Sequence, residues 1–283
     1  MVTTAWGINF LASKVAVDYF GPYLSLALRF ALVIVVLAPF VRLPARRIPA
    51  AATVGFLVGG VHFGLQFLGI ELSGDVSSIA ITSQLYIPMA TVLAVAFMGE
   101  RIGWRRSTAL ATAFAGIVVL GFDPVVFERL WALGALVLSA VPMALATLLM
   151  RRAVGIGALQ MQAWTGIVCL PFHALLSWML ESGQAMKLAE LPLWPALGLL
   201  WGGVGAAIVG QAGYAHLLSR YPVSTVTPMM LATPVLGVVA GIAIYGDQPS
   251  LQIVLGGLMT CGGVLILIMR TAQRGRATVV PSR

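Results

Sequence analysis

The stretch from residue 130 to residue 152 reads LWALGALVLSAVPMALATLLMRR. No Asp, Glu, Lys or Arg occurs in residues 130–150, and two arginines follow them directly. A helix needs about 20 predominantly apolar residues to cross the hydrocarbon core of a bilayer. The stretch therefore predicts a membrane-spanning helix over residues 130–150 that ends at a basic pair.

The composition of the whole chain agrees with this interpretation. Of the 283 residues, 60% are hydrophobic and only 9% are charged, whereas a soluble domain carries roughly 25% charge. The formal net charge is +8. Such an excess suggests nucleic acid in a soluble protein, but in a membrane protein it reports topology. We expect the lipid bilayer to surround this chain, and we expect the chain to bind no nucleic acid.

Nine further apolar segments are predicted as spans. Helix-breaking residues such as Gly21-Pro22 and Tyr221-Pro222 stand between them. The ten predicted spans cover residues 3–18, 23–41, 51–70, 76–98, 105–122, 130–150, 157–180, 193–217, 222–245 and 250–270. The residues after Arg270 form a basic tail.

The charges orient the ten spans. With the N-terminus in the cytoplasm, only Arg129 and Lys187 among the basic residues between spans face outward, and Glu100 is the only cytoplasmic acid. This asymmetry follows the positive-inside rule and predicts a bacterial inner-membrane protein with both termini in the cytoplasm. The thirteen cytoplasmic basic residues are Arg42, Arg46, Arg47, Arg101, Arg105, Arg106, Arg151, Arg152, Arg220, Arg270, Arg274, Arg276 and Arg283.

An internal repeat relates the two halves of the chain. Residues 97–101 read FMGER and residues 244–248 read IYGDQ, so both contain a Gly-acid pair. Each pair precedes small residues, at 115–116 and 262–263, at matching spacing, and proline interrupts the span before each pair. These three matches in the same order indicate a duplication.

Five helices per copy require the second copy to enter the membrane from the opposite side. The predicted fold is therefore an all-α membrane protein of ten transmembrane helices in two inverted five-helix repeats. The first repeat covers residues 1–123, the second covers residues 124–270, and a basic cytoplasmic tail covers residues 271–283. Inverted repeats hold a binding site near the bilayer midplane, so this architecture predicts transport.

Several short motifs carry a resemblance to a known family. They are Trp6-Gly7 with Phe10 and Lys14, Pro22 followed by Arg29-Phe30, and the corner Gly99-Glu100-Arg101 with Gly116. On these motifs the chain resembles the drug/metabolite transporter superfamily of the EamA type, and the aromatic amino-acid exporters are the most similar members. This resemblance implies export from the cytoplasm by alternating access.

Polar and aromatic side chains within the spans are candidates for a central substrate cavity, because polar groups at membrane depth are costly. A cavity with amide hydrogen bonds and aromatic walls suits a zwitterion with a bulky apolar side chain. We therefore expect an aromatic or large apolar amino acid as substrate. The candidates are Asn9, His62, Gln66, Gln84, Tyr86, Trp164, Trp201, Gln211 and Tyr214.

Some of these residues have a structural alternative. His62 with Gln66, and Gln211 with Tyr214, share one helical face and could equally hold neighbouring helices together. The charged residues within or near spans, Lys14 and Arg29, are expected to be structural partners of nearby groups. The prolines within spans are either hinges or constitutive bends; they are Pro88, Pro228 and Pro234.

The sequence also limits the energy source. No Asp or Glu lies deep within a predicted span, which argues against a carboxylate proton relay, and His62 is the best remaining titratable group. No phosphate-binding loop occurs, and Cys169 and Cys261 lie in apolar runs without further metal ligands. We expect a secondary carrier or a facilitator, without ATP hydrolysis, cofactor or metal.

Two other classes of function compete. A membrane enzyme needs a nucleophile with its base or a cluster of acids for a metal, and the chain contains no His-Glu-x-x-His or Gly-x-Ser-x-Gly. A channel favours a continuous polar stripe, whereas these polar groups gather near mid-depth. Within the transporter class, nucleosides, sugars and drugs remain alternative substrates.

Overall fold

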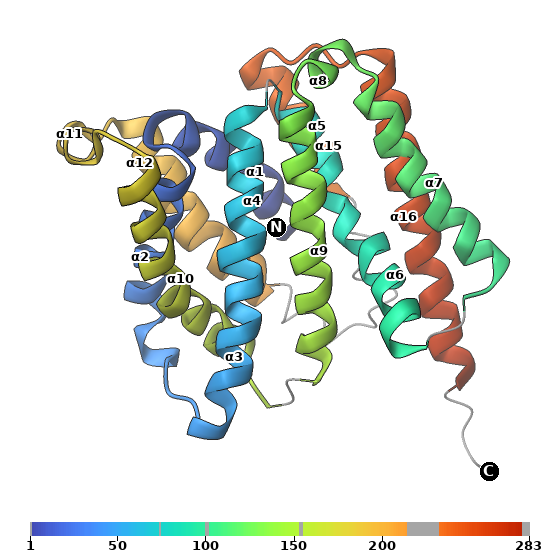
Figure 1. Cartoon of the computed structure of the whole chain (residues 1–283), viewed down its shortest axis with the longest axis horizontal. Helices are drawn as coiled ribbons and strands as arrows, with labels where there is room; N and C mark the ends of the chain where they lie inside the picture. The colour runs from blue at the N-terminus through green and yellow to red at the C-terminus, as the bar shows by residue number, and fades with distance from the viewer. Residues whose placement is uncertain (1, 74, 100–101, 153–154, 214–231, 279–283) are drawn as a thin grey trace.

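The computed structural model describes residues 2–73, 75–99, 102–152, 155–213 and 232–278. These residues are almost entirely helical and contain no strand (Figure 1).

The first half of the chain supplies the helices up to α7. Their bounds are α1 (Val2–Phe20), α2 (Pro22–Leu37), η1 (Ala38–Phe40), η2 (Ala45–Arg47), α3 (Ile48–Gly55), η3 (Phe56–His62), α4 (Phe63–Leu72), α5 (Val76–Thr82), η4 (Ser83–Leu85), α6 (Tyr86–Met98) and α7 (Trp104–Gly121).

The second half begins with a short turn of helix. Its elements are α8 (Pro124–Phe127), α9 (Leu130–Arg152), α10 (Ala158–Leu180), α11 (Gln184–Glu190), α12 (Leu193–Leu200), η5 (Trp201–Ala212), α15 (Ala232–Ala240), η6 (Gly241–Tyr245) and α16 (Leu251–Thr278).

Among the described residues, six helical segments are long and apolar enough to cross a membrane. They match six of the predicted spans, and two shorter apolar helices overlap two more. The remaining predicted spans coincide with α1 and α7, whose charged residues lower their hydropathy. The count of ten spans stays a prediction. The six segments are Pro22–Phe40, Ala45–Leu72, Val76–Phe97, Leu130–Met150, Ala158–Leu180 and Leu251–Arg270; the shorter helices are Leu193–Ala207 and Ala232–Tyr245.

The two Gly-acid corners end helices in the same way. Gly99 follows α6 with φ 66° and ψ 22°, and Gly246 follows η6 with φ 70° and ψ 23°. Both lie in the left-handed region that glycine enters without steric cost and that commonly terminates a helix. The repeated sequence motif is therefore also a repeated local structure.

Helices from the two halves pack against one another. At one end of the molecule α2 packs on α10, and at the other end α7 packs on α16 (Figure 1). Between these pairs, α4 and α6 pack on α9, while α12, η5 and α15 pack on α1. Each of these contacts thus joins a helix of the first half to a helix of the second half.

Glycines allow the closest of these approaches. A Cβ atom built on Gly116 of α7 would lie 2.6 Å from the carbonyl oxygen of Gly256 on α16, and one on Gly198 would lie 2.7 Å from that of Ala12 on α1. A side chain at either position would force the backbones apart.

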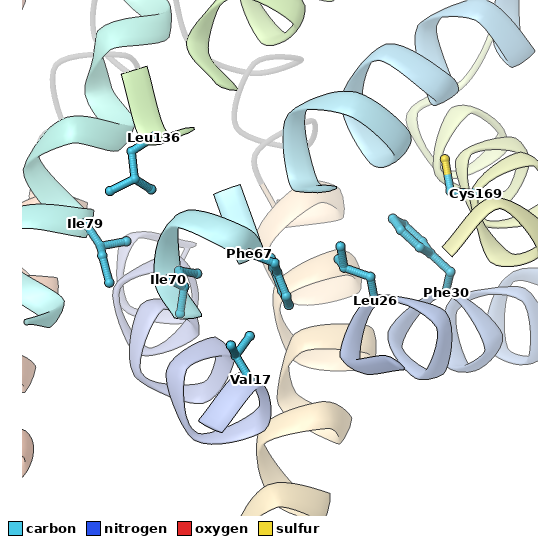
Figure 2. Close-up of a cluster of buried hydrophobic side chains, with 8 residues drawn as sticks. All are labelled: Val17, Leu26, Phe30, Phe67, Ile70, Ile79, Leu136 and Cys169. Atoms are coloured by element: carbon cyan, nitrogen blue, oxygen red, sulfur yellow. The ribbon is translucent and has the colours of Figure 1, made fainter. Parts of the chain in front are cut away.

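A cluster of buried side chains joins the halves near the middle of the bundle. Figure 2 shows its members in a row from Leu136 and Ile79 to Phe30 and Cys169. They come from six helices, α1, α2, α4, α5, α9 and α10, so this cluster holds both halves together. The full cluster is Val17, Leu26, Phe30, Phe67, Ile70, Ile79, Leu136 and Cys169.

The third span of each half departs from regular α-helix in the same place. The segments η3 and η5 are π-helical, a conformation that is rare and often found at functional sites. In η3, the Gly59 carbonyl accepts a hydrogen bond from Nε2 of His173 at 2.8 Å. The wider helix is thus stabilised by side chains of α10.

Candidate functional site

Arg29 is the most unusual buried side chain of the described bundle. It lies in the middle of α2 and is 5% exposed, and its Nε and Nη1 atoms have no hydrogen-bond partner. Its guanidinium carbon lies 4.8 Å from the ring centre of Phe63 and 5.9 Å from that of Phe67. The structural partner expected for Arg29 is not found for these two atoms among the described residues, whereas Lys14 forms an ion pair with Asp18.

Asn9 of α1 brings a second unpartnered group to the same place. Its Oδ1 atom is buried and accepts no hydrogen bond. A Cβ atom on Gly202 of η5 would lie 3.5 Å from this oxygen and 3.8 Å from Nη1 of Arg29. An acceptor and a donor that both lack partners therefore flank one point on the glycine surface of η5.

His62 and Gln66 are buried on the adjoining η3–α4 segment. Nδ1 of His62 lies 2.8 Å from the carbonyl oxygen of Ser139 on α9. A carbonyl only accepts, so Nδ1 carries the proton and Nε2 of the neutral ring is an acceptor. This bond is the interhelical one that the structural alternative predicts. Phe63 and Phe67 each follow one of these two residues and contact Arg29.

Gln84 and Tyr86 lie elsewhere in the bundle. Nε2 of Gln84 donates a long hydrogen bond of 3.5 Å to Ser83. Tyr86 packs against a second buried cluster that includes Leu85 and Ile117. The structure thus puts these two candidates on the α5–α7 side of the bundle, with a different apolar cluster from that of Arg29.

Both tryptophan candidates use their indole N–H to join helices. Nε1 of Trp164 donates to the carbonyl oxygen of Val41 at 3.0 Å, and Nε1 of Trp201 donates to that of Ala5 at 3.2 Å. Next to Trp164, Gln160 bonds the carbonyl of Arg42 at 2.9 Å. Trp164 therefore lies beside Val41 and Arg42, at the Arg-rich end of the molecule.

The remaining candidates are only partly described. Tyr214 and Pro228 lie outside the described residues, as does the side chain of Gln211, although its backbone belongs to η5. Pro88 is buried and follows the 3₁₀ turn η4 that separates α5 from α6. Pro234 is buried in α15.

Lys14 has the partner that was expected of it. Its Nζ donates to Oδ1 of Asp18 at 2.6 Å, and Tyr245 of η6 donates to Oδ2 of the same carboxylate at 3.1 Å. This chain of bonds connects the first half of the sequence to the second. It lies at the end of the molecule that carries most of the acids.

Two further acids cap helices of the opposite half, a role that the sequence analysis did not foresee. Oδ2 of Asp247 accepts from the backbone N–H groups of Val76 and Ser77, each at 2.9 Å. Glu181 accepts from those of Tyr23 and Leu24 at 2.8 and 2.9 Å. The Gly-acid motif pointed to Asp247, but no local signal names its distant partner.

No group of three or more His, Cys, Asp or Glu that could hold a metal ion is found in the part of the chain that the structure describes. The described side chains around Arg29 instead supply unpartnered hydrogen-bonding groups, a fixed charge and aromatic surface at mid-span, which are features suited to binding a ligand.

Comparison with known proteins gives a consistent result. Residues 1–122 and again residues 130–269 match the EamA-like transporter family. A protein of Escherichia coli (strain K12) named "probable amino-acid metabolite efflux pump" is 25% identical over 94% of this chain and 90% of its own length, and its namesake in Salmonella typhimurium has the same values.

A third relative, from Streptantibioticus cattleyicolor, is 28% identical over 100% of this chain and 96% of its own length. It is named "probable terminal-alkyne amino-acid exporter". A solved crystal structure aligns with a TM-score of 0.55 and 18% identity over 96% of this chain and 98% of its own. At that identity the alignment shows a shared fold alone.

Proposed function

The chain belongs to the EamA-like transporter family and is a multi-pass membrane protein, and on this premise we propose that it exports amino acids from the cytoplasm. The resemblance inferred from its short motifs is confirmed at the level of the family. The proposed substrates are aromatic or large apolar amino acids, and the proposed location is a bacterial inner membrane. Relatives named as amino-acid exporters, aligned over nearly the whole chain, support this assignment.

The observation that carries the proposal is the group of side chains around Arg29. A buried guanidinium and a buried amide oxygen without partners lie next to the rings of Phe63 and Phe67. An amino acid of this class has a charged end that hydrogen-bonds and an apolar end that packs on rings. The site offers both kinds of contact in the interior of the bundle.

We infer that the two halves are inverted repeats, an architecture that suits alternating access. Two separate matches to one family, over residues 1–122 and 130–269, support this. The packing supports it as well. The α2–α10 and α7–α16 pairs each join helices at the same position in the two halves. Likewise α9 of the second half packs on α4 and α6 of the first, and α1 of the first half packs on α12, η5 and α15 of the second.

The third span of each half adds a match in sequence. Residues 54–61 read VGFLVGGV and residues 197–204 read LGLLWGGV. Both stretches run into a π-helical segment. Similar sequence, similar irregular backbone and similar place within the half are what a duplicated helix retains.

A flux assay with purified protein tests the substrate assignment. Proteoliposomes are preloaded with labelled phenylalanine, leucine, uridine or glucose, and efflux is compared with that of protein-free liposomes. We expect saturable efflux of phenylalanine and leucine. Flux of uridine or glucose without flux of either amino acid would contradict the proposal.

A further inference from the structure

We propose that Arg29 binds the carboxylate, and Asn9 the ammonium group, of the transported amino acid. This inference rests on the proposed function and assigns the two ends of the substrate to two side chains. It takes a zwitterionic α-amino acid as the ligand.

The chemistry of Arg29 fits a carboxylate. A guanidinium presents five N–H donors in a planar fork that matches the two oxygens of a carboxylate. The rings of Phe63 and Phe67 lie within cation–π range of the guanidinium carbon and neither ring is a conventional acceptor for its N–H groups. Nε and Nη1 therefore retain unused donors.

A purely structural role explains this arginine poorly. A buried charge without a partner is strongly unfavourable, and charged residues within membrane spans mark functional sites by default. Two other cations of the described chain have protein acceptors: Lys14 bonds Asp18 at 2.6 Å, and Arg47 bonds the carbonyl of Gly155 at 2.5 Å. Nε and Nη1 of Arg29 have none among the described residues, although Arg29 is more deeply placed than Arg47.

Asn9 supplies the complementary acceptor. Its Oδ1 is buried without a donor, which is costly for the amide unless a ligand supplies one, and an ammonium group has three N–H donors. The carboxylate and ammonium of an α-amino acid are attached to one carbon. The two protein groups likewise flank one point, the surface of Gly202, where a Cβ atom would meet both of them at ordinary contact distance.

The neighbouring rings complete the site. Phe63 and Phe67 border the guanidinium, and an apolar substrate side chain can pack on them while its charged end meets Arg29 and Asn9. This arrangement favours amino acids over their amides, which lack the carboxylate, and over the corresponding acids, which lack the ammonium.

The test compares three ligands as inhibitors of phenylalanine counterflow in proteoliposomes. These are phenylalanine, phenylalaninamide and 3-phenylpropionate. For the wild type we expect both analogues to inhibit at least about tenfold more weakly than phenylalanine, as the loss of a charge-assisted hydrogen bond implies. Arg29→Met should bind phenylalanine and its amide about equally, and Asn9→Leu should lose the preference for phenylalanine over 3-phenylpropionate.

A matched control variant and a melting-temperature measurement complete the test. Arg106→Met on α7 replaces another buried arginine with an unpartnered Nε, and it should keep the wild-type selectivity. Arg29→Met should raise the melting temperature in detergent without amino acid, because it removes an uncompensated charge. It should also abolish the rise in melting temperature that phenylalanine gives the wild type.

The outcomes separate the two claims. A wild type that carries phenylalanine, together with an Arg29→Met variant that keeps full selectivity against the amide, overturns this inference and leaves the proposed function standing. A lower melting temperature of Arg29→Met with unchanged selectivity assigns Arg29 a structural role and has the same consequence. A wild type that carries no amino acid overturns both claims.

Discussion

At the scale of single residues, Lys14 and Arg29 have opposite surroundings. Both are cations in the middle of apolar sequence, and both were expected to be structural partners of nearby groups. Lys14 bonds Asp18 one helical turn away, a pairing that sequence spacing alone suggests. Whether Arg29 has a partner depends on which helices surround α2, and no local pattern contains that information.

Two glycines allow a residue-scale prediction. A Cβ atom on Gly202 would lie 3.5 Å from its nearest neighbour, at ordinary contact distance, whereas one on Gly198 would lie 2.7 Å from the Ala12 carbonyl. Gly198→Ala should therefore destabilise the protein by about 1–3 kcal/mol, the typical cost of overpacking. Gly202→Ala should cost less than about 1 kcal/mol. Thermal unfolding in detergent measures both, and equal losses would contradict the packing described here.

Gly202→Leu extends this comparison to function. A leucine side chain would fill the point between Asn9 and Arg29. We expect this variant to raise the KM for phenylalanine by about tenfold or more, since it occupies the proposed binding position. An unchanged KM in a folded variant would contradict the location of the site.

At the scale of helices, the acids at the ends of α10 and η6 cap helices of the other half. Asp247 accepts hydrogen bonds from the N-terminal backbone of α5, and Glu181 accepts them from that of α2. These bonds join the two halves at the acid-rich end of the bundle. In an alternating-access cycle they would have to break whenever that end opens.

Asp247→Ala tests this role at the scale of the element. Loss of a helix-capping carboxylate costs about 0.5–2 kcal/mol, and here it also weakens a contact between halves. We expect a lower melting temperature and faster labelling of a cysteine introduced at Ser77 by a membrane-impermeant maleimide. Asp247→Asn, which keeps one acceptor oxygen, is the matched control and should lie between Ala and wild type. An unchanged labelling rate in Asp247→Ala would contradict a role of Asp247 in closing this end of the bundle.

The positions of the spans were more predictable from the sequence than the irregular segments within them. Apolar length located six spans that the structure contains, because that signal is summed over about 20 residues. The Gly-acid corners also matched real helix ends, since only glycine tolerates the left-handed backbone well. The indole bonds of Trp164 and Trp201 join helices that are distant in the sequence. No local pattern predicts these bonds or the π-helical segments.

At the scale of the whole molecule, the inverted repeat predicts that the two Gly-acid corners lie on opposite faces of the membrane. Cysteines introduced at Arg105 and Gln248, both exposed, test this with a membrane-impermeant maleimide. Gln248→Cys should react in intact cells, and Arg105→Cys only after the membrane is permeabilised. The native Cys169 is buried and Cys261 is partly buried, so background labelling is low. Reaction of both positions in intact cells would contradict the inverted arrangement.

The central claim is that this membrane protein is a carrier for amino acids. Counterflow of labelled phenylalanine into proteoliposomes loaded with unlabelled phenylalanine tests it most directly, because a carrier exchanges one molecule for another while a channel only equilibrates them. We predict a transient accumulation of unmodified label above its equilibrium level, which protein-free liposomes do not give. A simple approach to equilibrium at the rate of protein-free liposomes, with leucine and phenylalanine alike, would contradict the account.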